Sequence, residues 1–437
     1  DQGGDYGSYD ISLPECDGVN ANIGYMGGDF KGLLEHADYI NGMGFTAVWL
    51  TPIVQNPDQA FSGGGEITCD SILTDHGKAA YHGYWAVNFH QEGEHLISSD
   101  LRFAGLTAGL KEKGLKTVLD IVGNHTSPAW GMDEAQAASS NFGKLYDANN
   151  TLIANHQNLP PEQLDSADPL QAMYNNEVGL AQLGDLNPQN PLVMQDLTQA
   201  YLQWIAQGAY AFRVDTIQFQ PYSFWKTFSD TIRAEHPGFF MFAEAFNTNA
   251  DEIAPYTWPE NGGISVLDFP MRSKLAEIFE QEDSDYSALL ETLHLEDGLY
   301  ANPYDLAIFY DNHDMARLNA SDENFINAHN WLFTARGFPV VYYGSEMGFM
   351  RGRKEHAGNR NYFGVEGITA AKDHIIYEHL KTVANLRKNS IALQRGQQIN
   401  IELDGDKDSI YSIYQYQGSR DIALVLLNKG SDAKGWC

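Results

Sequence analysis

Short apolar or β-branched runs alternate with amphipathic stretches through most of the chain, which predicts parallel strands connected by helices. The amphipathic stretches place apolar residues on one helical face, and they cover residues 101–113, 192–207, 222–236 and 325–336. Eight strands are expected, at 45–50, around 84–88, and at 116–122, 209–214, 239–243, 264–267, 306–310 and 340–343. Eight strands with matching helices predict an α/β fold, a closed (β/α)8 or TIM barrel.

Two regions depart from this alternation. Residues 124–190 are too many for an ordinary loop and are rich in Asn, Gln, Pro and Ala, so we expect an inserted subdomain after the third strand. From residue 391 the pattern changes to period two, which predicts a short antiparallel β domain over 391–437 that is either reduced or continues beyond this sequence. The barrel is then expected to comprise residues 1–123 and 191–390.

Composition narrows the classes of partner. The 437 residues include 43% hydrophobic and 19% charged side chains, and no apolar run approaches the roughly 20 residues that cross a bilayer. There are 58 acidic against 27 basic residues, a formal charge of −31. This balance argues against nucleic acid or an anionic membrane and suits a neutral polymer. We expect a monomer.

The cysteines point to location rather than to a scaffold. Cys16, Cys69 and Cys437 are too few for a disulfide framework and have the wrong spacing for a zinc ribbon, whereas a single Cys16–Cys69 bridge is compatible with them. Residues 1–10 are polar and contain no basic, apolar leader, so any signal peptide is expected to be already removed. We therefore expect a secreted, extracellular or periplasmic protein.

Polar side chains follow the ends of several predicted strands, which is where barrel enzymes carry their reacting groups. They are Asp120, Asn124 and His125 in "DIVGNH", Arg213 and Asp215 in "FRVD", Glu244 in "FAEAF", and Asn312, His313 and Asp314 in "FYDNHD". Any one of them is explained by a strand-end ion pair or a buried histidine. Four such clusters at strand ends favour a catalytic site.

A pair of carboxylates among these residues suggests the chemistry. Asp215 and Glu244 end adjacent strands, and two carboxyl groups about 5 Å apart serve as nucleophile and proton donor in retaining glycoside hydrolysis. Arg213 precedes Asp215 by two residues and so faces the same side of the strand, where its charge would keep Asp215 ionised. Glu244 follows an apolar strand, and partial desolvation suits a general acid.

These stretches resemble the motifs of a known family. "DIVGNH", "FRVDTIQF", "FAEAF" and "FYDNHD" are similar to the four main motifs of the α-amylase family, glycoside hydrolase family 13, in the same order. Supporting similarities are "GFTAVWLTP", "YHGYW", "LGDLN" and "GFPVVYYGSE". The resemblance extends over about residues 20–390 and is closest to α-amylases and cyclodextrin glucanotransferases. It implies the barrel, the insertion and an α-glucan substrate.

The resemblance also implies residue roles. Asp215 matches the nucleophile, Glu244 the acid/base and Asp314 the third essential carboxylate. The residues that match contacts to the sugar in the cleaved subsite are His82, Tyr84, His125, Arg213, His313 and Arg360. Tyr84 matches the aromatic platform under that sugar. No acid matching the one that usually precedes Arg360 is evident in the sequence.

Calcium is implied by the same resemblance. Asn124 and Asp185 match side chains of the family's structural calcium site, with backbone oxygens near Phe219, and such hard oxygen ligands suit calcium. A second candidate site resembles the N-terminal calcium loop of cyclodextrin glucanotransferases and consists of Asp17, Asn20, Asn22 and Asp29. A simple Gly- and Asn-rich turn explains that loop equally well.

Three functions remain open. An endo-acting α-1,4-glucan hydrolase of the α-amylase type is favoured, because Ala181 stands where glucanotransferases carry a central aromatic residue. A glucanotransferase or cyclodextrin-acting relative is the alternative, supported by the wording of the "NHTSP" and "DNHDMAR" stretches and by Phe246. Gln218 and Phe219 replace the family's usual Lys and His pair. A non-catalytic glucan-binding protein is disfavoured because all three carboxylates are present.

Overall fold

The structure is a computed structural model, and it describes residue 16 and residues 23–71, 73–282, 284–401 and 406–430. Two compact units are formed by segments that alternate along the chain. The first comprises Asp1–Asp38, Thr46–Glu244 and Glu355–Tyr362, and the second comprises Tyr39–Phe45, Ala245–Lys354 and Phe363–Cys437. Each unit is described by itself below.

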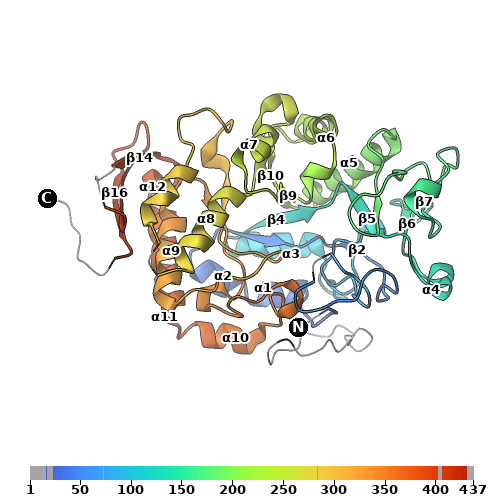
Figure 1. Cartoon of the computed structure of the whole chain (residues 1–437), viewed down its shortest axis with the longest axis horizontal. Helices are drawn as coiled ribbons and strands as arrows, with labels where there is room; N and C mark the ends of the chain where they lie inside the picture. Colours follow the sequence, from blue (N-terminus) through green and yellow to red (C-terminus); the bar gives the residue numbers. More distant parts are fainter. Residues whose placement is uncertain (1–15, 17–22, 72, 283, 402–405, 431–437) are drawn as a thin grey trace. The chain divides into compact units, whose positions relative to one another are not determined.

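Four parallel strands form the centre of the first unit. They follow one another in the order β1 (Ala47–Leu50), β4 (Lys116–Ile121), β9 (Ala209–Val214) and β10 (Phe240–Ala243), and β4, β9 and β10 are seen at the centre of Figure 1. The register aligns Asp120 with Arg213, and Arg213 with Phe242. Because all four strands are parallel, the residues that follow β4, β9 and β10 emerge at the same edge.

Amphipathic helices cover this sheet, as the apolar spacing predicts. They are α1 (Phe30–Glu35), α3 (Phe103–Glu112), α5 (Pro191–Ala206) and α6 (Tyr222–Glu235). Helix α5 begins after Asn190, whose side chain accepts a hydrogen bond from the Leu192 N–H, and has proline at its first position. Trp204 of α5 and Trp225 of α6 are almost completely buried, so the large rings of the helices form the packing between layers.

The long segment after β4 folds within the first unit. Strand β5 (His125–Pro128) pairs antiparallel with β8 (Leu183–Asp185), and β6 (Lys144–Tyr146) pairs with β7 (Leu152–Asn155). Helix α4 (Glu134–Ser139) precedes the second pair. An apolar cluster of Phe61, Ala80, Trp85, Met132, Phe142 and Leu183 supports the segment. The β5–β8 pairing places His125 opposite Asp185.

The second unit has its own parallel pair and helices. Its elements are α7 (Ala250–Ile253), β11 (Ser265–Val266), α8 (Phe269–Phe279), β12 (Ala307–Ile308), α9 (Asp322–Thr334), β13 (Phe338–Pro339), α10 (Gly364–Ala371), α11 (Ile375–Asn389) and α12 (Ile391–Arg395). Strands β12 and β13 are parallel. A buried ion pair of 2.6 Å joins Asp268 before α8 to Arg336 after α9. Helix α2 (Ala37–Gly42) includes residues of both units.

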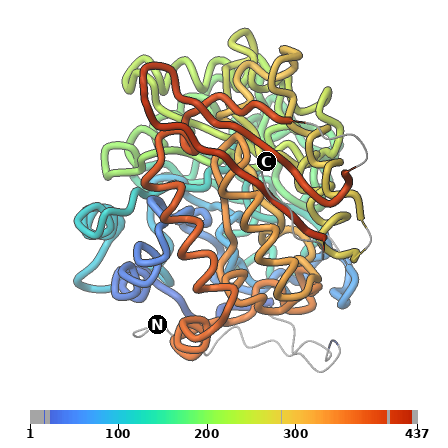
Figure 2. The backbone as a smooth tube through the Cα atoms, turned by 90° about the vertical axis from the view of Figure 1, so that its left-hand side faces the viewer, coloured from blue at the N-terminus to red at the C-terminus, as the bar shows by residue number. Residues whose placement is uncertain are grey.

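An antiparallel sheet follows α12 in the second unit. Strands β14 (Gln397–Ile401), β15 (Ser409–Gln415) and β16 (Ile422–Asn428) pair in sequence order. They form the red segment of Figure 2 beside the orange helices, and β16 packs against α9. Ile410 and Leu427 belong to the same buried cluster as Trp331 of α9. The predicted period-two region is therefore an antiparallel sheet, as expected.

Two strand predictions were misplaced. The apolar run at 84–88 was expected to be the second strand, but the strand found there is β3 (Asn88–Glu92), which pairs antiparallel with β2 (Val54–Gln55). Backbone N–H groups before this strand bond to side chains instead of to a neighbouring strand: the Tyr84 N–H donates to His82 Nδ1, and the Trp85 N–H donates to Asn56 Oδ1. The eighth strand lies at Phe338–Pro339 instead of 340–343, and the Val340 N–H continues its ladder to Ile308 O.

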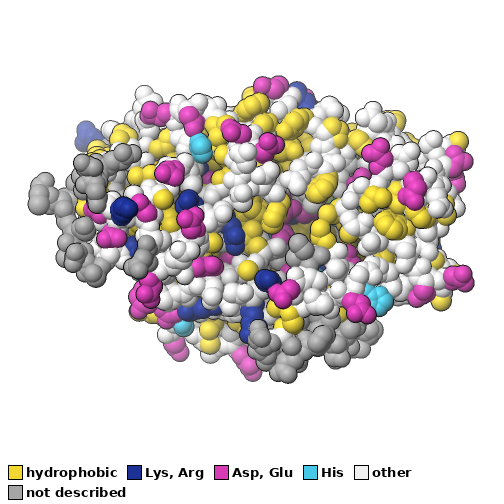
Figure 3. Space-filling view, viewed as in Figure 1, with side chains coloured by type: hydrophobic (Ala, Val, Ile, Leu, Met, Phe, Trp, Pro, Cys, Tyr) yellow, Lys and Arg dark blue, Asp and Glu magenta, His cyan; other side chains and the backbone are white. Residues whose placement is uncertain are grey.

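The predicted disulfide is confirmed, and the surface agrees with the composition. Cys16 and Cys69 are bridged, with Cα atoms 5.7 Å apart. Acidic side chains are scattered over the face seen in Figure 3 and are more frequent there than Lys and Arg. Within the described residues, no helix is both long and apolar enough to span a bilayer.

Candidate active site

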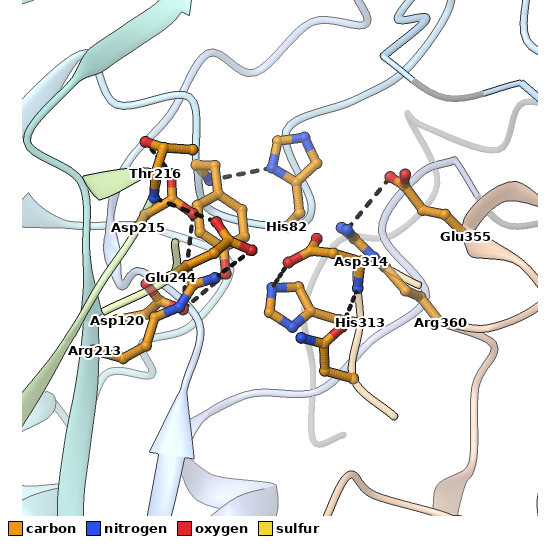
Figure 4. A network of polar contacts seen from close by, with 12 residues as sticks. His82, Asp120, Arg213, Asp215, Thr216, Glu244, His313, Asp314, Glu355 and Arg360 are labelled. Carbon is orange, nitrogen blue, oxygen red and sulfur yellow. Dashed lines mark hydrogen bonds and ion pairs between the residues drawn. The ribbon is translucent and has the colours of Figure 1, made fainter. Parts of the chain in front are cut away.

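Arg213 is the centre of a buried cluster of charges in the first unit. It lies on β9 with no exposed surface, and its Nη1 is 2.9 Å from Asp120 Oδ1 and 2.7 Å from Asp215 Oδ1. Its Nη2 is 3.0 Å from Glu244 Oε1. Figure 4 shows the three carboxylates converging on this one guanidinium. The predicted nucleophile and predicted acid/base are thus brought together by a shared cation.

Backbone contacts hold the two strand ends in register. The Asp215 N–H donates to Ile121 O at 2.8 Å, and the Glu244 N–H donates to Val214 O at 2.8 Å. Both residues are the first beyond their strands, so these bonds extend the parallel ladder by one step on each side. The carboxylates are consequently fixed by the sheet and not by a loop, which gives the precise placement that covalent catalysis needs.

Asp120 anchors the cluster from β4. Its Oδ2 accepts from the Tyr84 hydroxyl at 2.8 Å and from Trp49 Nε1 at 3.0 Å, in addition to Arg213. Burial raises the pKa of Asp120 to about 7, with Arg213 opposing the increase and Asp215 adding to it. Burial alone would lower the pKa of Arg213, but Asp120, Glu244 and Asp215 raise it well above its usual value. One permanent cation therefore faces three carboxyl groups, and burial disfavours the ionised form of Asp120.

Three of the residues predicted to contact the sugar, His82, Tyr84 and His125, lie beside this cluster. The rings of His82 and Tyr84 are 5.8 Å apart and nearly parallel, and the Arg213 guanidinium is 5.9 Å from the Tyr84 ring. Burial lowers the pKa of His125 despite the opposing charge of Asp215. Burial, then the charges of Lys78 and Arg360, hold the pKa of His82 well below its usual value. Both imidazoles are therefore neutral and able to donate and accept hydrogen bonds.

Arg360 is held by a partner that the sequence did not reveal. Glu355 Oε1 is 3.3 Å from Arg360 Nη2 and 3.4 Å from Lys78 Nζ, and Lys78 is also 2.9 Å from Asp75. Burial would raise the pKa of Glu355, but Arg360 and Lys78 hold it well below its usual value. The acid that was not evident from the sequence is thus Glu355, five positions before Arg360, and Arg360 is placed by a buried four-membered ion network.

The third predicted carboxylate belongs to the second unit. Asp314 Oδ2 is 3.1 Å from His313 Nε2, and the Asp314 N–H donates to Asn312 Oδ1 at 2.9 Å. These three residues follow β12 in the "FYDNHD" stretch, and Figure 4 shows the contact between His313 and Asp314. The asparagine fixes the turn that presents Asp314, so this carboxylate is positioned by its own neighbours in the chain.

The two side chains predicted to bind calcium also lie together. Asn124 ends the turn after β4 and Asp185 ends β8, and the Leu186 N–H donates to Asn124 O at 2.8 Å. Burial raises the pKa of Asp185, while hydrogen bonds from Asn175 and Asn124 lower it. Among the described residues, neither Asn124 Oδ1 nor Asp185 Oδ1 has a hydrogen-bond partner although both atoms are buried. Two unpartnered buried oxygens fit a hard cation.

Fewer contacts of the described residues bear on the other predicted calcium ligands. The Phe219 N–H donates to Thr216 O at 3.1 Å, and the neighbouring Gln220 Nε2 donates to Leu186 O at 2.8 Å, beside Asp185. Asp29 Oδ1 accepts from the Gly32 N–H at 2.7 Å and caps α1. Asp17, Asn20 and Asn22 lie outside the described residues, so the second calcium loop stays a prediction.

Comparison with known proteins decides the family. The family model "Alpha amylase, catalytic domain" matches residues 9–390. The chain belongs to the α-amylase family. The (β/α)8 fold class expected from the sequence is thereby confirmed, and the four motifs that carried the resemblance all lie within the matched residues.

Individual members of the α-amylase family resemble the chain over most of its length. A cyclomaltodextrin glucanotransferase of Geobacillus stearothermophilus is 29% identical, covering 94% of this chain and 55% of that protein. An alpha-amylase of Niallia circulans is also 29% identical, covering 93% of this chain and 74% of the relative. The solved three-domain cyclomaltodextrin glucanotransferase CldA superposes with a TM-score of 0.75 at 29% identity, covering 93% of this chain and 80% of the other. The chain spans about half the length of the glucanotransferase from Geobacillus.

Relatives of both kinds therefore leave the reaction type within the α-amylase family open. Thr216, Lys78 and Glu355 are site residues that sequence reasoning missed. Only Glu355 had a sequence signal, its position shortly before Arg360. The contacts of Thr216 follow from a left-handed backbone conformation that its residue type does not suggest.

Proposed function

We propose that the chain is a secreted, retaining α-1,4-glucan hydrolase that cleaves starch or maltooligosaccharides internally. The observation that carries this proposal is the shared contact of Asp215 and Glu244 with Arg213, at 2.7 Å and 3.0 Å. Two carboxyl groups held by one cation are close enough for nucleophile and proton donor to act on the same glycosidic bond. Family membership supplies the substrate class.

The reaction proceeds by two displacements. In the first, Asp215 forms a bond to the anomeric carbon as the glycosidic C–O bond breaks, and Glu244 gives its proton to the departing oxygen. In the second, water attacks the anomeric carbon, its proton passes to Glu244, and the Asp215 ester bond breaks. Two inversions give net retention. Arg213 keeps Asp215 available as an anion between cycles.

Other residues bind the sugar in this proposal. Tyr84 offers its ring to the sugar, and its hydroxyl is held by Asp120 at 2.8 Å, which fixes the ring plane. His82 and His125, both neutral, bind hydroxyl groups, and Arg360 is held in place by Glu355. Asp314 and His313 are assigned their roles by the family resemblance alone. An oxocarbenium-like transition state is stabilised by such anions and hydroxyl ligands.

Transfer to a second glucan is the other candidate. It is favoured by the glucanotransferase relatives and by Phe246, which is 52% exposed. Hydrolysis is favoured by Ala181, a small residue before β8, because it offers no ring around which a glucan could wrap. The two reactions share the first displacement and differ in whether water or a sugar hydroxyl attacks the ester.

Calcium is part of the proposal as a structural ion. Asn124 and Asp185 would hold it, with backbone oxygen near Phe219, and the unpartnered buried oxygens of the pair support this assignment. When bound, the ion would cross-link the end of β4 to β8 without taking part in bond cleavage. Secretion is supported by the Cys16–Cys69 disulfide, since such bonds persist in oxidising compartments. A monomeric state is retained as an expectation, to be checked by light scattering.

The test is product analysis on soluble starch with the wild type, Glu244→Gln and the control Glu235→Gln. Glu235 ends α6 on the surface of the same unit, so its substitution changes the same chemistry away from the cluster. We expect linear maltooligosaccharides of retained configuration from the wild type and the control, and a loss of at least about a hundredfold in Glu244→Gln. Cyclic or lengthened glucans as the main products would replace hydrolysis by transfer.

A further inference from the structure

Thr216, the residue after the predicted nucleophile, has a backbone conformation that is unfavourable for its type. Its φ and ψ are 46° and 41°, in the left-handed region, at the start of the short 3-10 helix η2 (Ile217–Phe219). A β-branched residue at positive φ is rare and carries strain unless its surroundings impose the conformation. Glycine or asparagine would adopt it at lower cost. The left-handed conformation of Thr216 therefore requires stabilising contacts from its surroundings.

Thr216 contacts both catalytic carboxylates. Its hydroxyl donates to Asp215 Oδ2 at 3.0 Å, and its backbone N–H donates to Glu244 Oε2 at 3.3 Å. Arg213 holds the opposite oxygens, Oδ1 of Asp215 and Oε1 of Glu244. Figure 4 shows Thr216 and Arg213 on either side of the pair. Three of the four carboxylate oxygens thus accept a hydrogen bond, one from Arg213 and two from Thr216, and the fourth, Glu244 Oε1, forms an ion pair with Arg213.

We propose that Thr216 is a positioning residue that fixes the orientation of Asp215 and Glu244 and favours release of the glycosyl ester. This inference rests on the proposed function, because it assigns Thr216 a part in that same double displacement. The left-handed turn is what lets the hydroxyl and the N–H of one residue reach two different carboxylates.

The hydroxyl acts differently on the two displacements. A hydrogen bond to an ionised carboxylate is stronger than one to an ester oxygen. The Thr216 hydroxyl therefore stabilises free Asp215 more than the glycosyl ester, which favours breaking of the ester bond when water attacks. Its removal makes Asp215 a better nucleophile and a poorer leaving group. The second displacement should then slow, and the covalent intermediate should accumulate.

Other charges around Asp215 do not replace this contact. Arg213 contacts Oδ1, while Asp120 and His125 influence Asp215 through their charged forms, which burial disfavours. The hydroxyl of Thr216 is consequently the neutral donor at Oδ2. Without this donor the negative charge on Asp215 is less stabilised, and the acidic limb of the pH profile should move to higher pH.

The experiment compares Thr216→Val, Thr216→Gly and Thr216→Ser with the wild type. Valine keeps the shape without the hydroxyl, glycine removes both the hydroxyl and the strain, and serine keeps the hydroxyl. The readouts are the pH dependence of kcat/KM on maltooligosaccharide, the fraction of protein carrying a glycosyl ester by mass spectrometry with α-maltosyl fluoride, and the melting temperature. Thr107→Val is the matched control, because its buried hydroxyl donates to two backbone oxygens, Gln207 O at 2.6 Å and Ala104 O at 3.0 Å.

We expect Val and Gly to lower kcat about tenfold, to move the acidic limb up by about one pH unit, and to accumulate the ester. Serine should resemble the wild type, and Thr216→Gly should melt at the same or a higher temperature while still showing the kinetic change. The inference is overturned if Val and Gly retain the wild-type pH profile and ester fraction in an active enzyme, or if activity only follows melting temperature. An inactive wild type overturns the proposed function first, and this inference with it.

Discussion

Two buried polar clusters in the first unit differ in how completely their side-chain oxygen atoms are paired with donors or cations. Around Arg213, each oxygen of Asp120, Asp215 and Glu244 accepts a hydrogen bond or faces a cation. At the Asn124 and Asp185 pair, by contrast, one buried oxygen of each side chain lacks a partner within the part of the chain that the structure describes. Both clusters follow strand ends of the same unit, and burial alone does not explain the difference.

The difference separates two uses of buried carboxylates. The Arg213 cluster supplies its own countercharge, so it needs no ion to exist and can change protonation during a reaction. The Asn124 and Asp185 pair has unmet oxygens, and leaving them without a partner costs about 1–3 kcal/mol each. For this reason we propose a catalytic role for the first cluster and a calcium ion at the second. Neutralising a carboxylate of the Arg213 cluster should therefore lower activity and leave the melting temperature nearly unchanged, whereas removing the ion from the second cluster should lower the melting temperature.

The largest effect is expected from Asp215→Asn. The amide cannot form the glycosyl ester, so turnover on starch should fall by at least about a thousandfold. Arg213 keeps Asp120 and Glu244 as partners, so the fold should persist, with a melting temperature close to that of the wild type. The measurement pairs reducing-sugar release with a thermal melt.

Asp230→Asn is the control for that substitution. Asp230 pairs with Lys226 on the surface of α6 at 2.6 Å, and neither activity nor melting should change noticeably. Unfolding of Asp215→Asn would mean that the carboxylate is structural, and retained turnover would move the nucleophile elsewhere.

A smaller effect, on stability, is expected from chelation. An ion bound only by the folded state stabilises it by about 3–4 kcal/mol when present at 100 to 1,000 times its dissociation constant. Chelator should therefore lower the melting temperature by several degrees, and added Ca²⁺ should restore it. Asp185→Asn should melt low with or without chelator, because the site has lost a charged ligand. The same chelator response in Asp185→Asn and the wild type would remove this pair from the calcium site.

The sequence predicted the strand ends of the Arg213 cluster because barrel geometry places them. Asp215 and Glu244 each follow an apolar run, and parallel strands bring such positions to one edge whatever the loops do. The same regularity explains why the strand at 209–214 was predicted with the bounds of β9. At Tyr84 and Trp85, side chains accept the hydrogen bonds of the backbone N–H groups, so the apolar run there did not predict the position of the strand.

Contacts that depend on a turn or on a distant segment could not be predicted. Thr216 reaches two carboxylates only because its backbone is left-handed, and nothing in a threonine indicates that conformation. Glu355 meets Lys78 across 277 positions of sequence. Apolar periodicity carries no information on such pairs. The motif resemblance named Arg360 but not the carboxylate that holds it.

The smallest expected effect concerns the lowered pKa of His82, which lies beside the Arg213 cluster. Burial and the cations Lys78 and Arg360 lower the pKa of His82, while an unfolded histidine titrates near about 6.5. Below that pH His82 is protonated in the unfolded chain but stays neutral in the folded protein. The contribution of neutral His82 to the free energy of unfolding is therefore lost as pH falls. The loss between pH 7 and 5.5 should be about 1 kcal/mol.

His82→Gln should flatten that fall in unfolding free energy, and the substitution of exposed His76 by glutamine is the control. The difference between wild type and His82→Gln should be the same with and without chelator. The pKa of His82 is set by burial and by the charges of Lys78, Arg360, Glu355 and His125, and neither Asn124 nor Asp185 is among these groups. Equal pH slopes in the two proteins would show that His82 titrates as it does in the unfolded chain. A slope difference that vanishes on chelation would instead join the two clusters into one electrostatic system, and the contrast between them would no longer hold.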